Sequence, residues 1–282
     1  MYKIVKKQIL NPCVTRMDIY APEIAKKAKP GQFIILRAFE NGERIPLTIA
    51  DTDEAEGLVT IIFQIIGHTT SKLNLLNEGE SILDFAGPLG TPSHTEGYKK
   101  VVIIGGGLGT AIAYPQAKAL HKNGALVHCI TGFRSSELII LEEEIKRVSD
   151  KTVIVTDDGS NGNRGFVTDA LKNLIDNGEK YDLVIAIGPL VMMRAVCNLT
   201  KEYGIKTIVS MNPIMIDGTG MCGGCRLTVG GQTKFACVDG PDFDGHLVDF
   251  DEAIRRSKMF AEMEKTSRDK DCNLMKGAEK NG

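Results

Sequence analysis

Short runs rich in valine, isoleucine and phenylalanine recur through the first hundred residues. The runs cover residues 32–37, 46–50, 58–66 and 81–86, and residues 1–8 lead into a similar alternating stretch. Turn-forming residues such as Lys29-Pro30-Gly31 and Asn41-Gly42 separate them. Closely spaced short strands predict a small antiparallel barrel. One helix is expected over 71–76, which contains no glycine or proline and follows a possible cap at Thr69.

The pattern changes at Val101. Strand-like runs at 101–104, 125–131, 152–156, 183–187 and 207–211 alternate with helix-length segments at 111–122, 137–148, 166–176 and 191–203. This alternation predicts a doubly wound parallel sheet with helices on both faces, so the fold class is a β barrel plus an α/β domain.

A glycine- and cysteine-rich block follows Met211, and a charged helix is expected over 251–265. The chain is therefore divided into a barrel at 1–97, an α/β domain at 98–211, a cysteine module with its helix at 212–265, and a polar tail at 266–282.

Composition narrows the class of protein. The 282 residues carry 34 Lys and Arg against 36 Asp and Glu, a net charge of −2, which gives no reason to expect nucleic-acid binding. The N-terminus lacks a signal peptide, and no apolar run reaches membrane-spanning length, so a cytoplasmic protein without a membrane segment is expected. The 7 cysteines are an odd number and form no disulfide framework in a chain of this length; clustered thiols then indicate metal or redox chemistry.

Three of the cysteines have the spacing of a metal centre. Cys222, Cys225 and Cys237 form a C-x2-C-x11-C pattern with glycines on both sides. Plant-type [2Fe–2S] sites use C-x4-C-x2-C and a distant cysteine, and here Asp217 stands at the first position. The sequence predicts an iron–sulfur cluster with Asp217 as fourth ligand.

Other interpretations of this block remain open. A structural zinc loop would have three thiolates and an oxygen ligand, an unusual set. Asp217 could instead form only a turn, with Cys13, Cys129 or Cys197 as the fourth ligand. Cys129 and Cys197 fall inside a predicted strand and a predicted helix, which favours buried packing roles.

A glycine loop joins the first strand of the α/β domain to its first helix. Such a loop directs backbone N–H groups and a helix N-terminus at one point, which suits a pyrophosphate. The strict G-x-G-x-x-G spacing fails, since Thr110 occupies the third glycine position, so a plain tight turn is the alternative. Two later strand ends carry Asp157-Asp158 and Gly188-Pro189, and carboxyl ends of parallel strands line the ligand crevice of such sheets. The two aspartates either bind ribose hydroxyls or cap their loop.

One barrel strand is unusual. Arg44 is followed by Pro46, Leu47 and Thr48, and a proline removes a ladder hydrogen bond from a sheet. An anionic planar ligand along this strand would explain the residues, whereas a solvated arginine on an edge strand is the simpler interpretation.

Together these motifs resemble the ferredoxin–NADP reductase superfamily, with a flavin-binding barrel before a nicotinamide-nucleotide domain. Over about residues 1–260 the sequence is most similar to iron–sulfur electron-transfer subunits: those of dihydroorotate dehydrogenase B and the alpha (small) subunits of NADH-dependent ferredoxin:NADP oxidoreductases. The dihydroorotate type has four cluster cysteines, and Asp217 replaces the first here, which favours the second group.

The resemblance implies FAD, a [2Fe–2S] cluster and NAD(H) as substrate. The residues matching the flavin site are Arg44, Pro46, Leu47, Thr48, Ile62, Phe63, Gln64, Thr69 and Thr70. Those matching the nicotinamide-nucleotide site are Gly105, Gly106, Gly107, Gly109, Thr110, Asp157, Asp158, Gly188 and Pro189. Thr69 replaces a glycine of the family's pyrophosphate turn. No catalytic side chain is expected, because the cofactors supply the chemistry.

The resemblance also implies a partner: a larger flavoprotein subunit with [4Fe–4S] clusters, in a complex that couples NADH, NADPH and ferredoxin by electron bifurcation. This chain would be the NAD-facing branch, although Arg134 would suit the 2′-phosphate of NADP. The alternatives are the electron-transfer subunit of dihydroorotate dehydrogenase and a zinc-stabilised nucleotide-binding regulator without redox activity.

Overall fold

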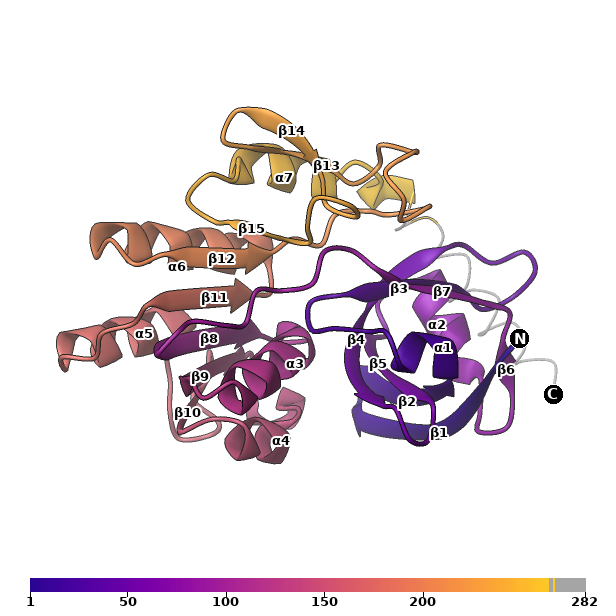
Figure 1. The fold of residues 1–282 in the computed structure, drawn as a ribbon, viewed down its shortest axis with the longest axis horizontal. Coiled ribbons are helices and arrows are strands. Elements are labelled where there is room, and N and C mark those ends of the chain that lie inside the picture. The colour runs from indigo at the N-terminus through magenta and orange to yellow at the C-terminus, as the bar shows by residue number, and fades with distance from the viewer. Residues whose placement is uncertain (264–265, 267–282) are drawn as a thin grey trace.

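The computed structural model describes residues 1–263 and 266, so the expected polar tail after Thr266 lies outside the described residues. An antiparallel barrel and a parallel-sheet α/β unit lie side by side, and the cysteine-containing segment covers one end of the α/β unit (Figure 1). The predicted fold class is confirmed.

Seven antiparallel strands form the barrel in the order β6-β1-β2-β5-β4-β3-β7. They are β1 (Tyr2–Asn11), β2 (Val14–Tyr20), β3 (Phe33–Arg37), β4 (Ile45–Asp53), β5 (Leu58–Gln64), β6 (Ser81–Ile82) and β7 (Asp84–Leu89). Two helices accompany them, α1 (Pro22–Ala25) and α2 (His68–Leu75). The alternation of the strands places Met17, Ile34, Ile61 and Phe63 in one fully buried core.

The barrel differs from the prediction at two places. The run at 81–86 is two strands, and β7 continues to Leu89 where a pattern break was expected at Gly87-Pro88. Helix α2 begins at His68, three residues before the predicted start at 71, because the Thr70 hydroxyl accepts a hydrogen bond from the Gly67 amide at 3.2 Å. Thr70, in the first turn of the helix, thus caps the N-terminus of α2 with its side chain.

The α/β unit is built on a six-stranded sheet of order β10-β9-β8-β11-β12-β15. Five strands are parallel: β8 (Lys100–Gly106), β9 (Leu126–Phe133), β10 (Lys151–Thr156), β11 (Leu183–Ile187) and β12 (Thr207–Ser210). Helices α3 (Gly109–Lys122), α4 (Glu142–Arg147), α5 (Val167–Asp176) and α6 (Leu190–Glu202) cover its faces, with two buried clusters of aliphatic side chains between the layers. The helix expected over 137–148 is instead a 3-10 turn (Ser136–Leu138) followed by α4, because Leu141 adopts φ 55° between them.

The block after Met211 adds elements that the sequence pattern did not indicate. A hairpin of β13 (Arg226–Val229) and β14 (Gln232–Phe235) precedes β15 (Asp242–Asp244), which pairs antiparallel with β12 and extends the α/β sheet. Helix α7 (Phe250–Ser257) packs on β13 and α6 and is shorter than the expected 251–265 helix, because a turn interrupts it at 258–260. Within the described ranges, none of the helices has the length and apolar character needed to traverse a bilayer.

Candidate iron–sulfur and nucleotide sites

The loop that carries the cysteines is organised by the Asp217 carboxylate. Its Oδ2 accepts hydrogen bonds from the amides of Met221 at 2.9 Å and Cys222 at 3.0 Å. Gly218 and Gly220 adopt φ 77° and 85°, which lets the chain fold tightly around the carboxylate. Asp217 therefore fixes the loop as well as standing beside its first thiol.

The four predicted ligands form two pairs. Cys222 Sγ lies 3.3 Å from Asp217 Oδ1, and Cys225 Sγ lies 3.2 Å from Cys237 Sγ. Cys225 and Cys237 are buried, whereas Cys222 is exposed. Among the described residues, no three His, Cys, Asp or Glu side chains surround a single-ion position. Two pairs suit a binuclear cluster, in which each iron takes two protein ligands.

The ionisation of these groups reflects their surroundings. Desolvation opposes ionisation of Asp217, but hydrogen bonds from Thr219, Cys222 and Met221 outweigh it and lower its pKa to about 2. Burial and the Cys225 contact raise the pKa of Cys237 to about 12. The Asp217 carboxylate is therefore ionised at neutral pH, whereas the buried Cys237 thiol must lose its proton when a cluster binds.

The remaining cysteines in the described ranges lie elsewhere in the fold. Cys129 is buried in β9 and Cys197 in α6, and burial raises the pKa of each thiol to about 12. Cys13 lies at the turn between β1 and β2 of the barrel. Buried, protonated thiols of this kind act as packing residues, as the sequence indicated for the first two.

The predicted nucleotide loop joins β8 to α3. A Cβ added at Gly109 would lie 2.2 Å from the Ile187 carbonyl oxygen, and one at Gly106 would lie 2.4 Å from Met192 Sδ. The glycines therefore let the loop approach the end of β11 and the start of α6. Gly107 has φ 55° with open space beside it, so the loop presents bare backbone there. Thr110 is fully buried with its hydroxyl against Gly105, so its side chain packs against the loop and does not face solvent.

The acidic strand end lies at the end of β10, one strand beyond β9, which separates it from β8. Asp157 and Asp158 follow β10, and their amides donate to the carbonyls of Phe133, the last residue of β9, and of Arg134. Asp158 Oδ1 accepts from both the amide and the hydroxyl of Ser160, at 2.9 and 2.7 Å, and these hydrogen bonds lower the pKa of Asp158. The structure thus gives Asp158 a loop-capping role and leaves the Asp157 carboxylate exposed. Gly188 and Pro189 lie at the neighbouring end of β11, where Pro189 precedes α6.

The predicted flavin residues lie on β4, β5 and α2 of the barrel. Arg44 is exposed and precedes β4, while Pro46, Leu47 and Thr48 are half-buried within it. Ile62 and Phe63 are buried in β5, and Gln64 at its end is exposed. Thr69 Oγ1 donates to Glu43 Oε2 at 2.8 Å, which joins the start of α2 to the residue before Arg44.

Two residues that contact the predicted sites were not predicted from the sequence. Glu43 connects the arginine loop to α2, and Met192 packs against both Gly106 and Gly188. No local motif marks either residue, since each acts on a segment distant in sequence.

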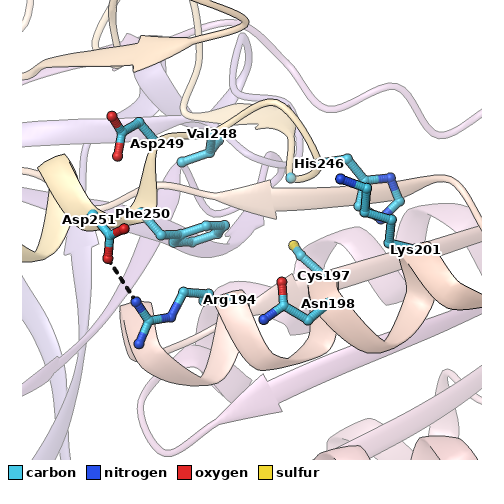
Figure 2. Close-up of a pocket in the computed structure, with 10 residues that line it drawn as sticks. Arg194, Cys197, Asn198, Lys201, His246, Val248, Asp249, Phe250 and Asp251 are labelled. Atoms are coloured by element: carbon cyan, nitrogen blue, oxygen red, sulfur yellow. Dashed lines mark hydrogen bonds and ion pairs between the residues drawn. The ribbon is translucent and has the colours of Figure 1, made fainter.

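Two cavities in the described part of the chain contain none of the predicted site residues. One, of about 240 Å³, lies between α6 and the segment around α7 (Figure 2). Arg194 and Asp251 form an ion pair of 3.0 Å across its edge, with Phe250 and Asn198 beside it. The other, of about 570 Å³, lies between the barrel and α3 and includes Lys29 and Lys118.

The fold and the paired thiols define an iron–sulfur electron-transfer subunit built on the ferredoxin-reductase plan. A ferredoxin reductase of carbazole 1,9a-dioxygenase shares that fold with a TM-score of 0.60 at 18% identity, over 72% of this chain and 65% of that one. Residues 212–249 match the model of the iron–sulfur cluster binding domain of dihydroorotate dehydrogenase B.

Two relatives cover nearly the whole chain. A dihydroorotate dehydrogenase B electron transfer subunit homolog from Thermotoga maritima is 48% identical over 265 residues, 94% of this chain and 93% of that protein. A solved structure of an NADH-dependent reduced ferredoxin-NADP oxidoreductase matches with a TM-score of 0.91 and 46% identity, covering 96% of this chain and 97% of that chain. The chain belongs to the family of dihydroorotate dehydrogenase B-type electron transfer subunits, which are oxidoreductase subunits.

Proposed function

We propose that this chain exchanges a hydride between NAD(H) and FAD, and single electrons with a [2Fe–2S] cluster, within an NADH-dependent bifurcating ferredoxin:NADP oxidoreductase. The observation that carries the proposal is the pairing of Asp217 with Cys222 and of Cys225 with Cys237, together with a TM-score of 0.91 to a structure described for flavin-based electron bifurcation. Flavin and cluster, when bound, supply two-electron and one-electron chemistry; the protein positions and tunes them.

The proposed cofactor sites occupy the three parts of the chain. Residues 1–97 would hold FAD through Arg44, the β4 residues, β5 and the start of α2. Residues 98–211 would hold NAD(H) on the glycine loop, with the exposed Asp157 carboxylate free for a ribose hydroxyl. Residues 212–265 would hold the cluster through Asp217, Cys222, Cys225 and Cys237.

We also propose a larger partner subunit with [4Fe–4S] clusters, through which ferredoxin and NADP(H) react. Large apolar side chains beside the cluster loop are exposed, including Met221 at 88% and Ile216 at 53%. Exposed apolar groups beside an exposed ligand, Cys222, favour a protein surface as the next electron acceptor.

The test is anaerobic purification with its natural partners. Flavin and iron–sulfur absorption bands, with a large flavoprotein co-purifying, would support the proposal. A colourless protein would refute the redox function, and zinc in it would support the regulator alternative.

A second candidate function is the electron-transfer subunit of an NAD-dependent dihydroorotate dehydrogenase. The match of residues 212–249 to that family's cluster domain favours it. Co-purification of a dihydroorotate-oxidising flavoenzyme, and dihydroorotate-dependent NAD reduction by the complex, would select it over the first.

A further inference from the structure

A buried carboxyl group lies where three parts of the chain meet. Asp242 begins β15, five positions after the cluster residue Cys237. Its Oδ2 accepts from Ser93 Oγ at 2.5 Å and from Gln116 Nε2 at 3.3 Å. Ser93 belongs to the connecting segment between the barrel and the α/β unit, and Gln116 belongs to α3. The carboxyl group of Asp242, itself in the cluster module, therefore contacts the other two parts.

Further hydrogen bonds hold the connecting segment against its neighbours at this junction. Thr91 donates from its amide to the Gly240 carbonyl at 2.7 Å and from its hydroxyl to the Val238 carbonyl at 3.1 Å. The Ser93 amide donates to the Pro30 carbonyl of the barrel at 2.9 Å. The connecting segment is thus held between the barrel and the turn that follows Cys237.

Two oxygen atoms at this junction lack a donor. Asp242 Oδ1 and Gln116 Oε1 are both shielded from solvent, and neither has a hydrogen-bond partner within the described residues. They belong to side chains that already meet through Gln116 Nε2 and Asp242 Oδ2. An ionised carboxylate only accepts hydrogen bonds, whereas a protonated one also donates. A proton on Oδ1 would therefore satisfy both atoms through a two-point acid–amide pair.

The surroundings favour the neutral acid. The side chains that contact the carboxyl group, from the connecting segment, α3 and β12, are Ser93, Gln116 and Ser210, and none of them is charged. Burial raises the pKa of Asp242, and the hydrogen bonds that the carboxylate accepts only partly oppose this rise.

We propose that Asp242 is a positioning residue that, as a neutral carboxylic acid paired with the Gln116 amide, sets the cluster module against the connecting segment and the α/β unit. The inference rests on the proposed function for its consequence, because the placement of the module then governs electron transfer between flavin and cluster. Asparagine has the same shape and presents both a donor and an acceptor, so Asp242→Asn preserves the pair. Asp242→Ala leaves the Gln116 amide without its partner.

The protonation state is measured first, on the full chain, by infrared difference spectroscopy between wild type and Asp242→Asn at neutral pH. A protonated carboxyl C=O band is expected in the wild type and lost in the variant. Asp244→Asn is the matched control, since Asp244 lies on the same strand and accepts from the His246 amide at 3.0 Å. Absence of a band that depends on Asp242 would overturn the proposal, whether or not any cofactor is bound.

The pH dependence of unfolding gives a second measure. Because the folded pKa is raised, the unfolded chain releases its proton first as pH rises above the usual value of 3.8. The unfolding temperature of Asp242→Asn relative to wild type should therefore increase as pH rises from acid toward neutral. A constant difference would contradict a neutral acid.

The positioning role is read from electron transfer in the holoprotein. We expect Asp242→Asn to keep the rate of cluster reduction by NADH, and Asp242→Ala, with FAD and iron content retained, to slow it about tenfold. An unchanged rate in the loaded alanine variant would refute positioning. If that variant fails to fold, the infrared and pH comparisons with Asp242→Asn still decide the neutral-acid pair, and wild type without FAD or iron would refute the proposed function alone.

Discussion

Cys222 Sγ lies 3.3 Å from Asp217 Oδ1, and the same carboxylate accepts the Cys222 amide at 3.0 Å through its other oxygen. Asp217, which stands where the ligand pattern has a cysteine, therefore also shapes the loop that carries Cys222, the next predicted ligand. Loss of this side chain would remove a predicted ligand and would also loosen the loop that carries Cys222.

The first prediction concerns this carboxylate. Asp217→Ala should reduce bound iron about tenfold or more at limiting iron and leave FAD content unchanged, since the flavin residues lie in the barrel. Asp217→Cys should retain iron, with a changed EPR spectrum of the reduced cluster. Asp239→Asn, in the same module, is the control, because its side chain accepts the Phe235 amide at 2.7 Å and is not a predicted ligand. Equal iron and an identical EPR spectrum in Asp217→Ala would remove Asp217 from the ligands.

A related prediction concerns stability of the cluster-free chain at low pH. The pKa of Asp217 is lowered to about 2 because hydrogen bonds to its carboxylate outweigh desolvation. The stabilisation is present above the usual carboxyl pKa and is lost as pH falls toward about 2. In acid titrations, followed by circular dichroism, Asp217→Asn should lose less stability than wild type; parallel titrations would show that the carboxylate is not stabilised by these contacts.

Substitution of the buried cysteines tests which of them are cluster ligands and which are packing residues. Cys225→Ser and Cys237→Ser should each abolish the cluster, because both thiols of one pair are needed on the same iron. Cys197→Ala should keep full iron content and cost about 1 kcal/mol in unfolding free energy, since it removes a small buried group. Iron analysis and denaturant titration measure the two effects. Iron loss in Cys197→Ala would place that thiol at the metal site.

The arginine before β4 tests the flavin site. Arg44 is exposed, without a structural role in the barrel core, so Arg44→Ala should lower FAD occupancy while the unfolding temperature of the flavin-free chain stays unchanged. Arg37→Ala is the control: Arg37 lies on the neighbouring strand β3 and pairs with Asp84 of β7 at 2.6 Å. Undiminished flavin in Arg44→Ala would make it an ordinary solvated arginine.

Two glycines of the nucleotide loop should respond differently to alanine. Gly109→Ala forces a Cβ to 2.2 Å from a backbone oxygen, so it should destabilise the chain by about 3 kcal/mol. Gly107→Ala meets open space but must hold φ 55°, which costs about 1–2 kcal/mol. Its larger effect should be a raised KM for NADH, because the methyl group covers bare backbone where a nucleotide would approach. Equal KM values for Gly107→Ala and wild type would place the nucleotide elsewhere.

The pattern of apolar residues along the sequence determined the coarse architecture of this protein. Strand β11 has the predicted bounds, and the other parallel strands differ by one or two residues at their ends, because runs such as 101–104 are buried on both faces and are apolar throughout. The spacing of Cys222, Cys225 and Cys237 likewise predicted a cluster in this segment, and residues 212–249 match a model of an iron–sulfur cluster binding domain.

Only the tertiary structure decided what depends on contacts between distant segments. Strand β15 joins β12, and Glu43 meets Thr69, through pairings that leave no local period in the sequence. The arrangement of the four predicted ligands as two pairs, and the contacts of the Asp242 carboxyl group with Ser93 and Gln116, likewise follow from packing across the chain. Local sequence sets which residues form strands and a cluster loop, whereas the free energy of burying polar groups together sets where those parts meet.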